Sequence, residues 1–314
     1  MTVHLKPGDR VLLENRSSEV YSGTIEYISA KSVNLNSISC HSTNTEYEGN
    51  MTFYRNEVVK IVLISDTESA STSDNMPAAT EDSLVTSKKI NMHPDEYARL
   101  RQVTFDFVFI DTFGTHFDNA VEVLNNRESV AVAGLGNNYV RSKPLSVLVM
   151  SDFKQVFIFD LLCLGKLSGL GEVLESDFIC KVVHDGGALF DCLYHKYGVE
   201  MKNVFDTQVV DTMLSKEKDD VEIKRNISEC LTYHFNFPAA LLSAVLDTIN
   251  DKSWCKRPLL KSDKIKSAQL VVYLLSLRDQ LMKQILKKYT GAITKEYSKY
   301  KQMSDIEVLK FRKQ

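Results

Sequence analysis

One segment limits how this 314-residue chain can fold, because it separates two regions rich in apolar residues. Residues 65–89 are rich in Ser, Thr, Asp, Glu and Ala and contain almost no large apolar side chain. Such a segment buries too little apolar surface to offset the entropy lost on ordering. The sequence therefore predicts a flexible linker at 65–90, between a small module at 1–64 and a larger one at 91–314.

The first module alternates apolar and polar residues in short stretches between turn signals such as Pro7-Gly8-Asp9. This pattern predicts a small all-β barrel with strands at 11–13, 21–27, 33–38, 52–54 and 58–63.

The larger module has the mixed pattern of an α/β fold. It predicts strands at 105–111, 130–133, 146–150 and 156–159, a parallel strand at 181–184, and helices at 188–197, 227–235, 238–246 and 265–288.

Three separated segments of the larger module resemble, in this order, the motifs of the DEDD 3′-5′ exonucleases. The segments are Val108-Phe109-Ile110-Asp111-Thr112-Phe113-Gly114, then Lys181-Val182-Val183-His184-Asp185 with Phe205-Asp206-Thr207-Gln208 after it, and Trp254-Cys255-Lys256-Arg257-Pro258-Leu259 leading to Tyr273-Leu274-Leu275. The resemblance covers about residues 100–290 and implies a ribonuclease H-like architecture. It also implies a site where carboxylates hold two divalent ions about 3.5–4 Å apart.

The four carboxylate positions, carried over residue by residue, are Asp111, Phe113, Leu189 and Leu270. Side chains alternate along a strand, so 111 and 113 are expected on one face of the first strand. Leucine and phenylalanine have no oxygen to offer an ion. The resemblance therefore predicts a pseudonuclease with no catalytic residue, no metal and no cofactor.

Nearby acids do not restore the missing ligands. Asp191 lies two residues after Leu189, about 200° around a helix, and Asp263 lies about 10 Å along a helix from Leu270. Lys266, where the family has a tyrosine, adds a positive charge where an ion would sit. Ligands donated by another loop remain the alternative.

Three polar residues of these motifs have structural interpretations. Asp111 is interpreted as a relic or a cap at the strand end, and Asp206 as the N-cap of a helix. His184 is interpreted as a half-buried histidine with satisfied hydrogen bonds.

The net charge of −3 conceals a strong division along the chain. Residues 251–314 contain 16 Lys and Arg against 6 Asp and Glu, a balance of +10, so residues 1–250 sum to −13. A basic region is typical of a surface that binds a polyanion such as RNA. The alternative is that these lysines only keep a helix face soluble. Beside the exonuclease motif, the candidates for RNA contact are Lys252, Lys256, Arg257, Lys261, Lys264 and Lys266.

The first module resembles an Sm-like domain. The matching features are Gly23 in the second strand, Val33-Asn34-Leu35, and Tyr54-Arg55-Asn56 before the last strand, while the Asp and Gly of the Sm motifs are replaced by Ala30 and Asn56. The resemblance makes Asn34 and Arg55 loop candidates for RNA contact. Because the Asp and Gly are missing, protein contact is an equal alternative.

The remaining composition excludes some classes of protein. No apolar run approaches the ~18 residues that span a bilayer, and the N-terminus lacks the apolar core of a signal peptide. Six cysteines without a Cys-x-x-Cys pair predict reduced core residues rather than zinc ligands or disulfides. The sequence predicts a cytoplasmic protein without a membrane partner.

The C-terminal region offers apolar residues spaced three apart between lysines, at Tyr297, Tyr300, Met303, Ile306 and Leu309. Such spacing lines one helical face. It predicts a homodimer formed by the larger module, with packing onto the same domain as the alternative.

The order of modules resembles the piRNA-pathway members of the exonuclease family. This implies an inactive adaptor in piRNA biogenesis that binds single-stranded RNA and a Tudor-domain protein and resides in germ granules (nuage). Two other hypotheses stay open, a residual metal-dependent 3′-5′ exoribonuclease and a protein-interaction scaffold without RNA binding.

Overall fold

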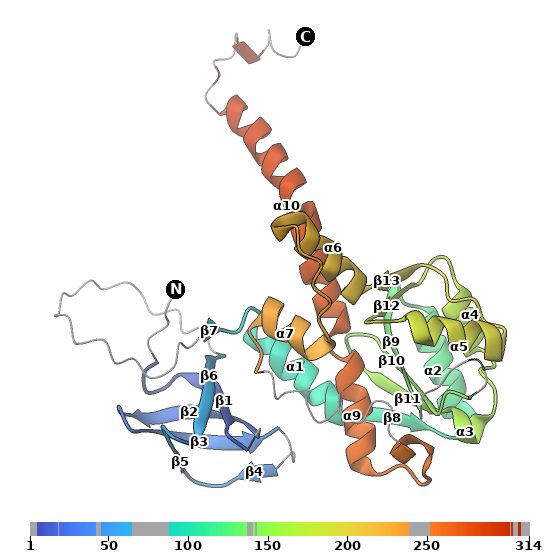
Figure 1. The fold of residues 1–314 in the computed structure, drawn as a ribbon, viewed down its shortest axis with the longest axis horizontal. Coiled ribbons are helices and arrows are strands. Elements are labelled where there is room, and N and C mark those ends of the chain that lie inside the picture. Colours follow the sequence, from blue (N-terminus) through green and yellow to red (C-terminus); the bar gives the residue numbers. More distant parts are fainter. Residues whose placement is uncertain are drawn as a thin grey trace.

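The computed structural model describes residues 5–17, 19–41, 45–64, 88–136, 141, 143–238, 252–301, 303 and 307–308. Within them the chain forms two β-sheets, and helices cover the second sheet (Figure 1). Predicted linker residues 65–87 and predicted helix residues 239–246 lie outside the described residues.

The N-terminal sheet confirms the five strands predicted for the first module. Its strands are β1 (Arg10–Asn15), β2 (Val20–Ile28), β3 (Ser32–Cys40), β4 (Thr45–Tyr47), β5 (Met51–Tyr54), β6 (Val58–Leu63) and β7 (Lys88–Lys89). They lie in the order β4-β3-β2-β1-β6-β7, and β5 also pairs with β3. Strand β4 has only three residues, all exposed, so it carries no alternation that predicts it. The last residues of the predicted linker belong to the fold, because β7 pairs with β6 and Ile90 is buried.

Gly23 allows β2 and β3 to approach each other closely. It lies at a register shift between the strands, where an added Cβ would come within 3.0 Å of the carbonyl oxygen of Asn36. A larger residue would therefore displace β3.

The second sheet is mixed and buried on both faces. Its strands are β8 (Phe107–Ile110), β9 (Ser129–Leu135), β10 (Val147–Ser151), β11 (Val156–Asp160), β12 (Cys180–Val183) and β13 (Val204–Asp206), in the order β13-β12-β9-β10-β11-β8. Strand β12 is parallel to both neighbours, as predicted for residues 181–184. These features confirm the α/β fold class.

Helices cover both faces of this sheet. They are α1 (Pro94–Phe105), α2 (Thr115–Asn125), α3 (Leu161–Leu164), α4 (Leu170–Glu175), α5 (Gly187–Tyr197), α6 (Thr207–Asp219), α7 (Ile227–Phe235), the 3-10 helix η2 (Lys252–Cys255), α9 (Lys261–Val271) and α10 (Leu274–Tyr300). Alternation along β10 divides the core: Val147 and Val149 pack in one cluster with α1, α9 and α10, whereas Leu148 and Met150 pack in another with α2, α4 and α5.

Two predicted boundaries of the larger module are wrong. Residues 94–105 form α1, so the strand predicted from 105 begins only at Phe107 and ends at Ile110. The helix predicted at 265–288 is two helices with a break at Val272 and Tyr273. The break is needed because α9 packs across β9–β11, whereas α10 runs along α6 and α7.

The two modules pack directly against each other. In β1, Val11 and Leu13 point into the core of the N-terminal sheet, while Leu12 packs in a core cluster that contains Leu100 of α1. Lys60 of β6 also donates a hydrogen bond of 3.1 Å to the carbonyl of Phe237. Strand β1 is therefore buried on both faces, and α1 lies at the boundary between the modules (Figure 1).

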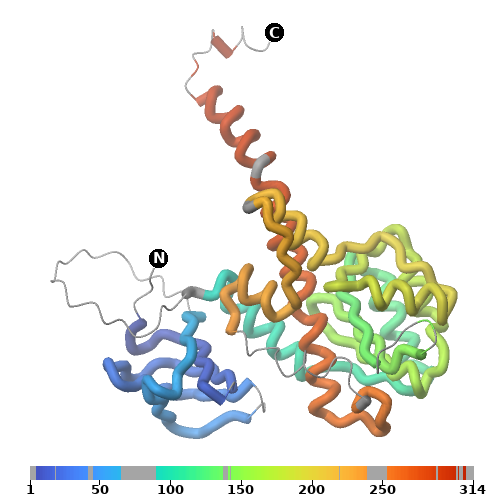
Figure 2. The backbone as a smooth tube through the Cα atoms, in the orientation of Figure 1, coloured from blue at the N-terminus to red at the C-terminus, as the bar shows by residue number. Residues whose placement is uncertain are grey.

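Helix α10 begins in the core and then extends away from the rest of the fold, as Figure 2 shows. No described helix is both long and apolar enough to cross a membrane. Cys163 and Cys255 are exposed, so the prediction that all six cysteines are core residues is wrong for these two.

Candidate functional site

The first predicted motif lies just beyond the end of β8. The strand stops at Ile110, so Asp111 and Phe113 follow in a bend, and the alternation expected for a strand does not apply to them. That expectation was wrong because the main chain leaves the sheet one residue early. Phe113 is 44% exposed and packs edge-on against Phe117, with 4.8 Å between ring centroids. The ammonium of Lys166 lies 5.3 Å from the centroid of the Phe113 ring.

The third carboxylate position, Leu189, lies at the start of α5. Leu189 is 3% exposed and packs so closely on β9 that a Cβ on Gly134 would lie 2.8 Å from its Cδ1. Asp191 has the opposite environment: its exposed carboxylate accepts a hydrogen bond of 3.0 Å from Nε of Arg141. It faces away from Leu189, as helical geometry predicts.

The fourth carboxylate position, Leu270, and Lys266 lie on α9, between the two parts of the third motif. Leu270 is 7% exposed and belongs to the core, and Lys266 is half-buried. Lys264 reaches β8, where its ammonium lies 3.4 Å from the ring centroid of Phe109. The positive charge next to β8 therefore comes from Lys264, whereas the sequence analysis had assigned it to Lys266.

These side chains do not fit a pair of divalent ions. Phe113, Leu189 and Leu270 have no oxygen, so Asp111 is the one carboxylate among the four positions. A two-ion site needs several carboxylates to hold both ions at a short separation. A single exposed carboxylate does not supply that.

Asp206 and His184 have the structural roles that the sequence predicts. Asp206 is the N-cap of α6, and its Oδ1 accepts from the backbone N–H of Gln208 at 2.9 Å. His184 is half-buried, with Nδ1 2.9 Å from Oγ1 of Thr207 and Nε2 3.1 Å from the carbonyl oxygen of Arg225. Burial lowers the pKa of His184, which favours its neutral form.

A buried polar cluster joins α6, α7 and α10, and the sequence analysis did not identify it. Nε2 of His234 donates to Oδ1 of Asp211 at 2.7 Å, and Arg225 donates to Oδ2 at 2.9 Å. The thiol of Cys230 donates to Oδ2 at 3.4 Å, and Gln284 of α10 lies 3.0 Å from Nδ1 of His234. Cys230 and His234 lie four residues apart on the predicted helix, which places them on one face and was the available signal.

The hydrogen bonds of this cluster compete with metal binding. Asp211, Cys230 and His234 offer ligand atoms within 4.8 Å of one another, but both oxygens of Asp211 already accept hydrogen bonds. Burial and the carboxylate of Asp211 raise the pKa of the Cys230 thiol, which disfavours the thiolate that a metal would bind. The guanidinium of Arg225 further disfavours a cation there.

The basic RNA candidates lie on η2, in the segment that follows it and on α9, with different surroundings. Lys256 and Lys261 are exposed, and the side chain of Lys252 lies outside the described residues. Arg257 forms an ion pair with Asp160, which is 1% exposed, at 2.5 Å from Nε to Oδ2. Its guanidinium therefore holds the chain beside β11. We call Lys256, Lys261, Lys264 and Lys266 the α9 basic surface.

The two Sm-like candidates lie on different elements of the N-terminal module. Asn34 lies in β3, and its Oδ1 is buried without a partner. Arg55 lies in the exposed turn between β5 and β6, beside a cavity of about 50 Å³. Among the described residues no hydrogen bond joins their side chains.

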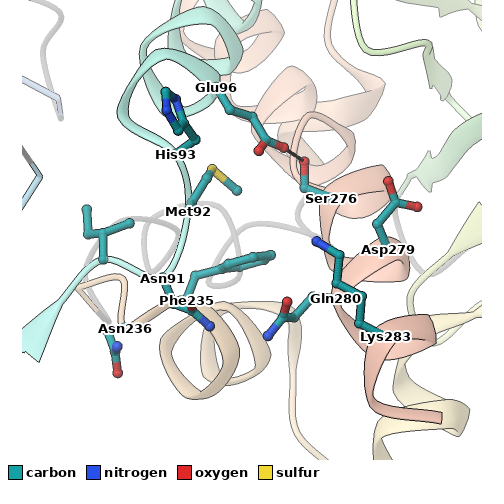
Figure 3. A pocket seen from close by; sticks show the side chains of 11 residues that line it. Asn91, Met92, His93, Glu96, Phe235, Asn236, Ser276, Asp279, Gln280 and Lys283 are labelled. Carbon is teal, nitrogen blue, oxygen red and sulfur yellow. Dashed lines mark hydrogen bonds between the residues drawn. The ribbon is translucent and has the colours of Figure 1, made fainter. Parts of the chain in front are cut away.

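A larger hollow of about 610 Å³ lies between the segment before α1, the end of α7 and α10. Figure 3 shows side chains from these elements turned toward it, with Glu96 accepting a hydrogen bond of 2.6 Å from Ser276. Glu96, Asp279 and Lys283 give it charges of both signs. It contains none of the predicted site residues.

The fold and motifs define a class of protein. Residues 115–286 match the 3′-5′ exonuclease family, and the chain belongs to that family. The match begins just after Asp111 and Phe113. Trypanosoma brucei RNase D in complex with RNA U12 has a similar fold, at a TM-score of 0.53 and 20% identity over 60% of this chain and 65% of that one.

Among curated proteins, the chain is similar to piRNA biogenesis protein EXD1 from several animals. It is 34% identical to the Bombyx mori protein over 173 residues, 54% of this chain and 54% of that protein. It is 29% identical to the Mus musculus protein over 277 residues, 85% of this chain and 46% of that protein. The chain spans about half the length of the curated relatives it matches.

Proposed function

We propose that this chain is a non-catalytic RNA-binding adaptor of piRNA biogenesis built on the exonuclease fold. The observation that carries the proposal is the set of side chains at the four ligand positions. Leu189 and Leu270 are packed in the core, and Phe113 packs edge-on against Phe117. Acid side chains at 189 and 270 would need the core to rearrange.

Charge and similarity support RNA as the ligand. Three of the four lysines of the α9 basic surface lie on the helix whose Lys264 reaches β8, and the RNase D with a similar fold was solved with RNA. The lysines of the α9 basic surface would bind the phosphates of single-stranded RNA, which carry no sequence information. Arg257 serves the fold instead, through its pair with Asp160.

We also propose a protein partner and a role for the N-terminal module. The similarity to piRNA biogenesis proteins supports a role beside a Tudor-domain protein in germ granules. The N-terminal sheet, as an Sm-like module, would present the exposed Arg55 turn to RNA or protein. The division into modules at 1–64 and 91–314 is part of the same proposal.

Labelled single-stranded RNA, incubated with the full chain and Mg²⁺ or Mn²⁺, is expected to be retained without shortening. Asp111→Ala is expected to change neither retention nor RNA length, because one carboxylate cannot hold two ions. Retention and product length are scored on the same samples. Metal-dependent shortening that Asp111→Ala abolishes would support a residual exonuclease, and absence of retention would support a scaffold without RNA binding.

The part of α10 from Met282 to Tyr300 supports a homodimer. Its exposed apolar side chains are Met282, Leu286, Tyr289, Ile293, Tyr297 and Tyr300. At 100° per residue these six lie within about 80° of arc, which makes one continuous stripe. The six side chains are between 37% and 68% exposed, and Ile306 and Leu309 lie outside the described residues.

We expect light scattering to give a dimer mass for the full chain at micromolar concentration. The double change Leu286→Glu and Ile293→Glu is expected to give the monomer mass, because two charges would be buried in the stripe interface. Lys295→Glu, on the opposite side of the helix, serves as the control and should remain dimeric. A monomeric native protein, or a dimer that tolerates the double change, would contradict this interface.

A further inference from the structure

An aromatic ring lies exposed in the bend that follows β8. Residues 111–116 are all at the surface, and the side chain of Phe113 is 44% exposed. A ring that stays in water forgoes the stabilisation that burial would give it. A ligand that covered Phe113 would gain this contribution on binding.

The ring of Phe113 is supported by the core beneath it. It packs edge-on against Phe117, with 4.8 Å between ring centroids, and Phe117 packs edge-on against Phe159 at 6.0 Å. Phe117 is 4% exposed and Phe159 is completely buried. A side chain that is already held by its neighbours loses little further freedom when a ligand contacts it. The ring is therefore a preorganised surface.

A positive charge lies beside this ring. The ammonium of Lys166, in the exposed segment between α3 and α4, is 5.3 Å from the centroid of the Phe113 ring. In the part of the chain that the structure describes, this ammonium makes no hydrogen bond or ion pair. A cation–π contact at an exposed site is weak, so the ammonium is free to bind an anion instead.

We infer that Phe113 stacks an unpaired base of single-stranded RNA while Lys166 contacts a neighbouring phosphate. Proteins that bind single strands combine aromatic rings with basic side chains, because every base has a π-face and every linkage has a charge. A protein partner is disfavoured, because the centres of protein interfaces are depleted of charged groups and Asp111 and Lys166 are both exposed here. The inference rests on the proposed function and adds a base contact to it.

The ring lies within reach of RNA on the α9 basic surface. Lys264 of that surface contacts Phe109 of β8, with its ammonium 3.4 Å from the ring centroid. Four residues separate Phe109 from Phe113, and four residues of extended chain span at most about 14 Å. A strand of RNA held at Lys264 therefore needs only a short extension to place a base on Phe113.

The test compares two oligomers of equal length, a short single-stranded RNA and an abasic oligomer with the same ribose-phosphate backbone. The full chain is expected to bind the RNA roughly 5-fold or more tightly, because a stacked base contributes at least that much. Phe113→Ala is expected to lose this preference, and Phe113→Trp, which keeps a ring, is expected to retain it. Fluorescence anisotropy measures both affinities.

Lys166→Ala tests the phosphate contact separately. It is expected to reduce the salt slope by about 0.7 for both oligomers, because one phosphate contact is lost. Phe178→Ala and Lys154→Ala are the matched controls, since Phe178 is 92% exposed and Lys154 is exposed in the turn between β10 and β11. Both controls should bind as the wild type does. The thermal midpoint of each variant shows that the fold is intact.

The outcomes separate this inference from the proposed function. Equal binding of the two oligomers by the wild type, or a preference that survives in Phe113→Ala, overturns the stacking contact and leaves RNA binding by the α9 basic surface intact. The ring would then be assigned to a protein contact. An unchanged salt slope in Lys166→Ala overturns the phosphate contact. Absence of binding to both oligomers overturns the proposed function itself.

Discussion

Replacing Asp211 with Ala is expected to lower the free energy of unfolding by about 3–5 kcal/mol. The change leaves the guanidinium of Arg225 and the imidazole of His234 without their shared acceptor. The side chains of Asp211 and His234 are 1% and 2% exposed, so water does not replace the lost hydrogen bonds. Chemical denaturation measures the change.

The matched control is Asp191→Ala, which breaks an aspartate–arginine pair on the surface. The side chains of Asp191 and Arg141 are 37% and 66% exposed, so the expected loss is below about 1 kcal/mol. Equal losses in the two variants would show that the buried cluster contributes no more than a surface pair. A melting midpoint lowered by EDTA would instead reveal a bound metal.

The Asp211 cluster also predicts how stability depends on pH. Burial alone would raise the pKa of Asp211, but the hydrogen bonds from His234 and Arg225 outweigh it, and the pKa lies below its usual 3.8. The folded state then binds fewer protons than the unfolded state, so this contribution is fully present above about pH 4. It is lost as the pH falls through the folded pKa, and the loss should be absent in Asp211→Ala.

Affinity for single-stranded RNA is expected to fall roughly 50-fold between 50 and 200 mM salt. That figure follows if the four lysines of the α9 basic surface each displace a counterion, at a slope near −0.7 per contact for single strands. The triple change Lys261→Glu, Lys264→Glu and Lys266→Glu should remove most of the binding for every sequence, because phosphates carry no sequence information. Filter binding across a salt series measures both effects.

The control for the RNA experiment makes the same change in net charge on α10, at Lys283, Lys287 and Lys295. This variant should retain RNA binding and its salt slope. Because Lys264 packs on Phe109, the melting midpoint of the α9 variant is measured, and Lys256→Glu with Lys261→Glu provides a fully exposed alternative. Binding that is indifferent to salt, or that survives both α9 variants, would mean that these lysines are only solvated.

Local pattern explains which elements were predictable. Helix α7 coincides with the predicted helix at 227–235, because its apolar period and the Asn226 cap lie within a few residues of each other. Helix α1 was missed although Pro94 at its first position is a common start signal. The break at Val272 was also missed, since apolar residues continue through it, and only packing against different partners bends the chain.

The sequence by itself determined that only one of the four positions assigned from the resemblance, Asp111, carries a carboxylate, because motif order and spacing are local properties. It also determined most strands of the two sheets, although not β4, β7 and β13, and the cap at Asp206. Only the tertiary structure decided which polar groups meet across long separations. Arg257 pairs with Asp160, Asp211 meets His234, and Arg101 reaches Ser22. These contacts depend on which faces pack together, and the packing of one element is set by the shape of all the others, which periodicity along the chain does not record.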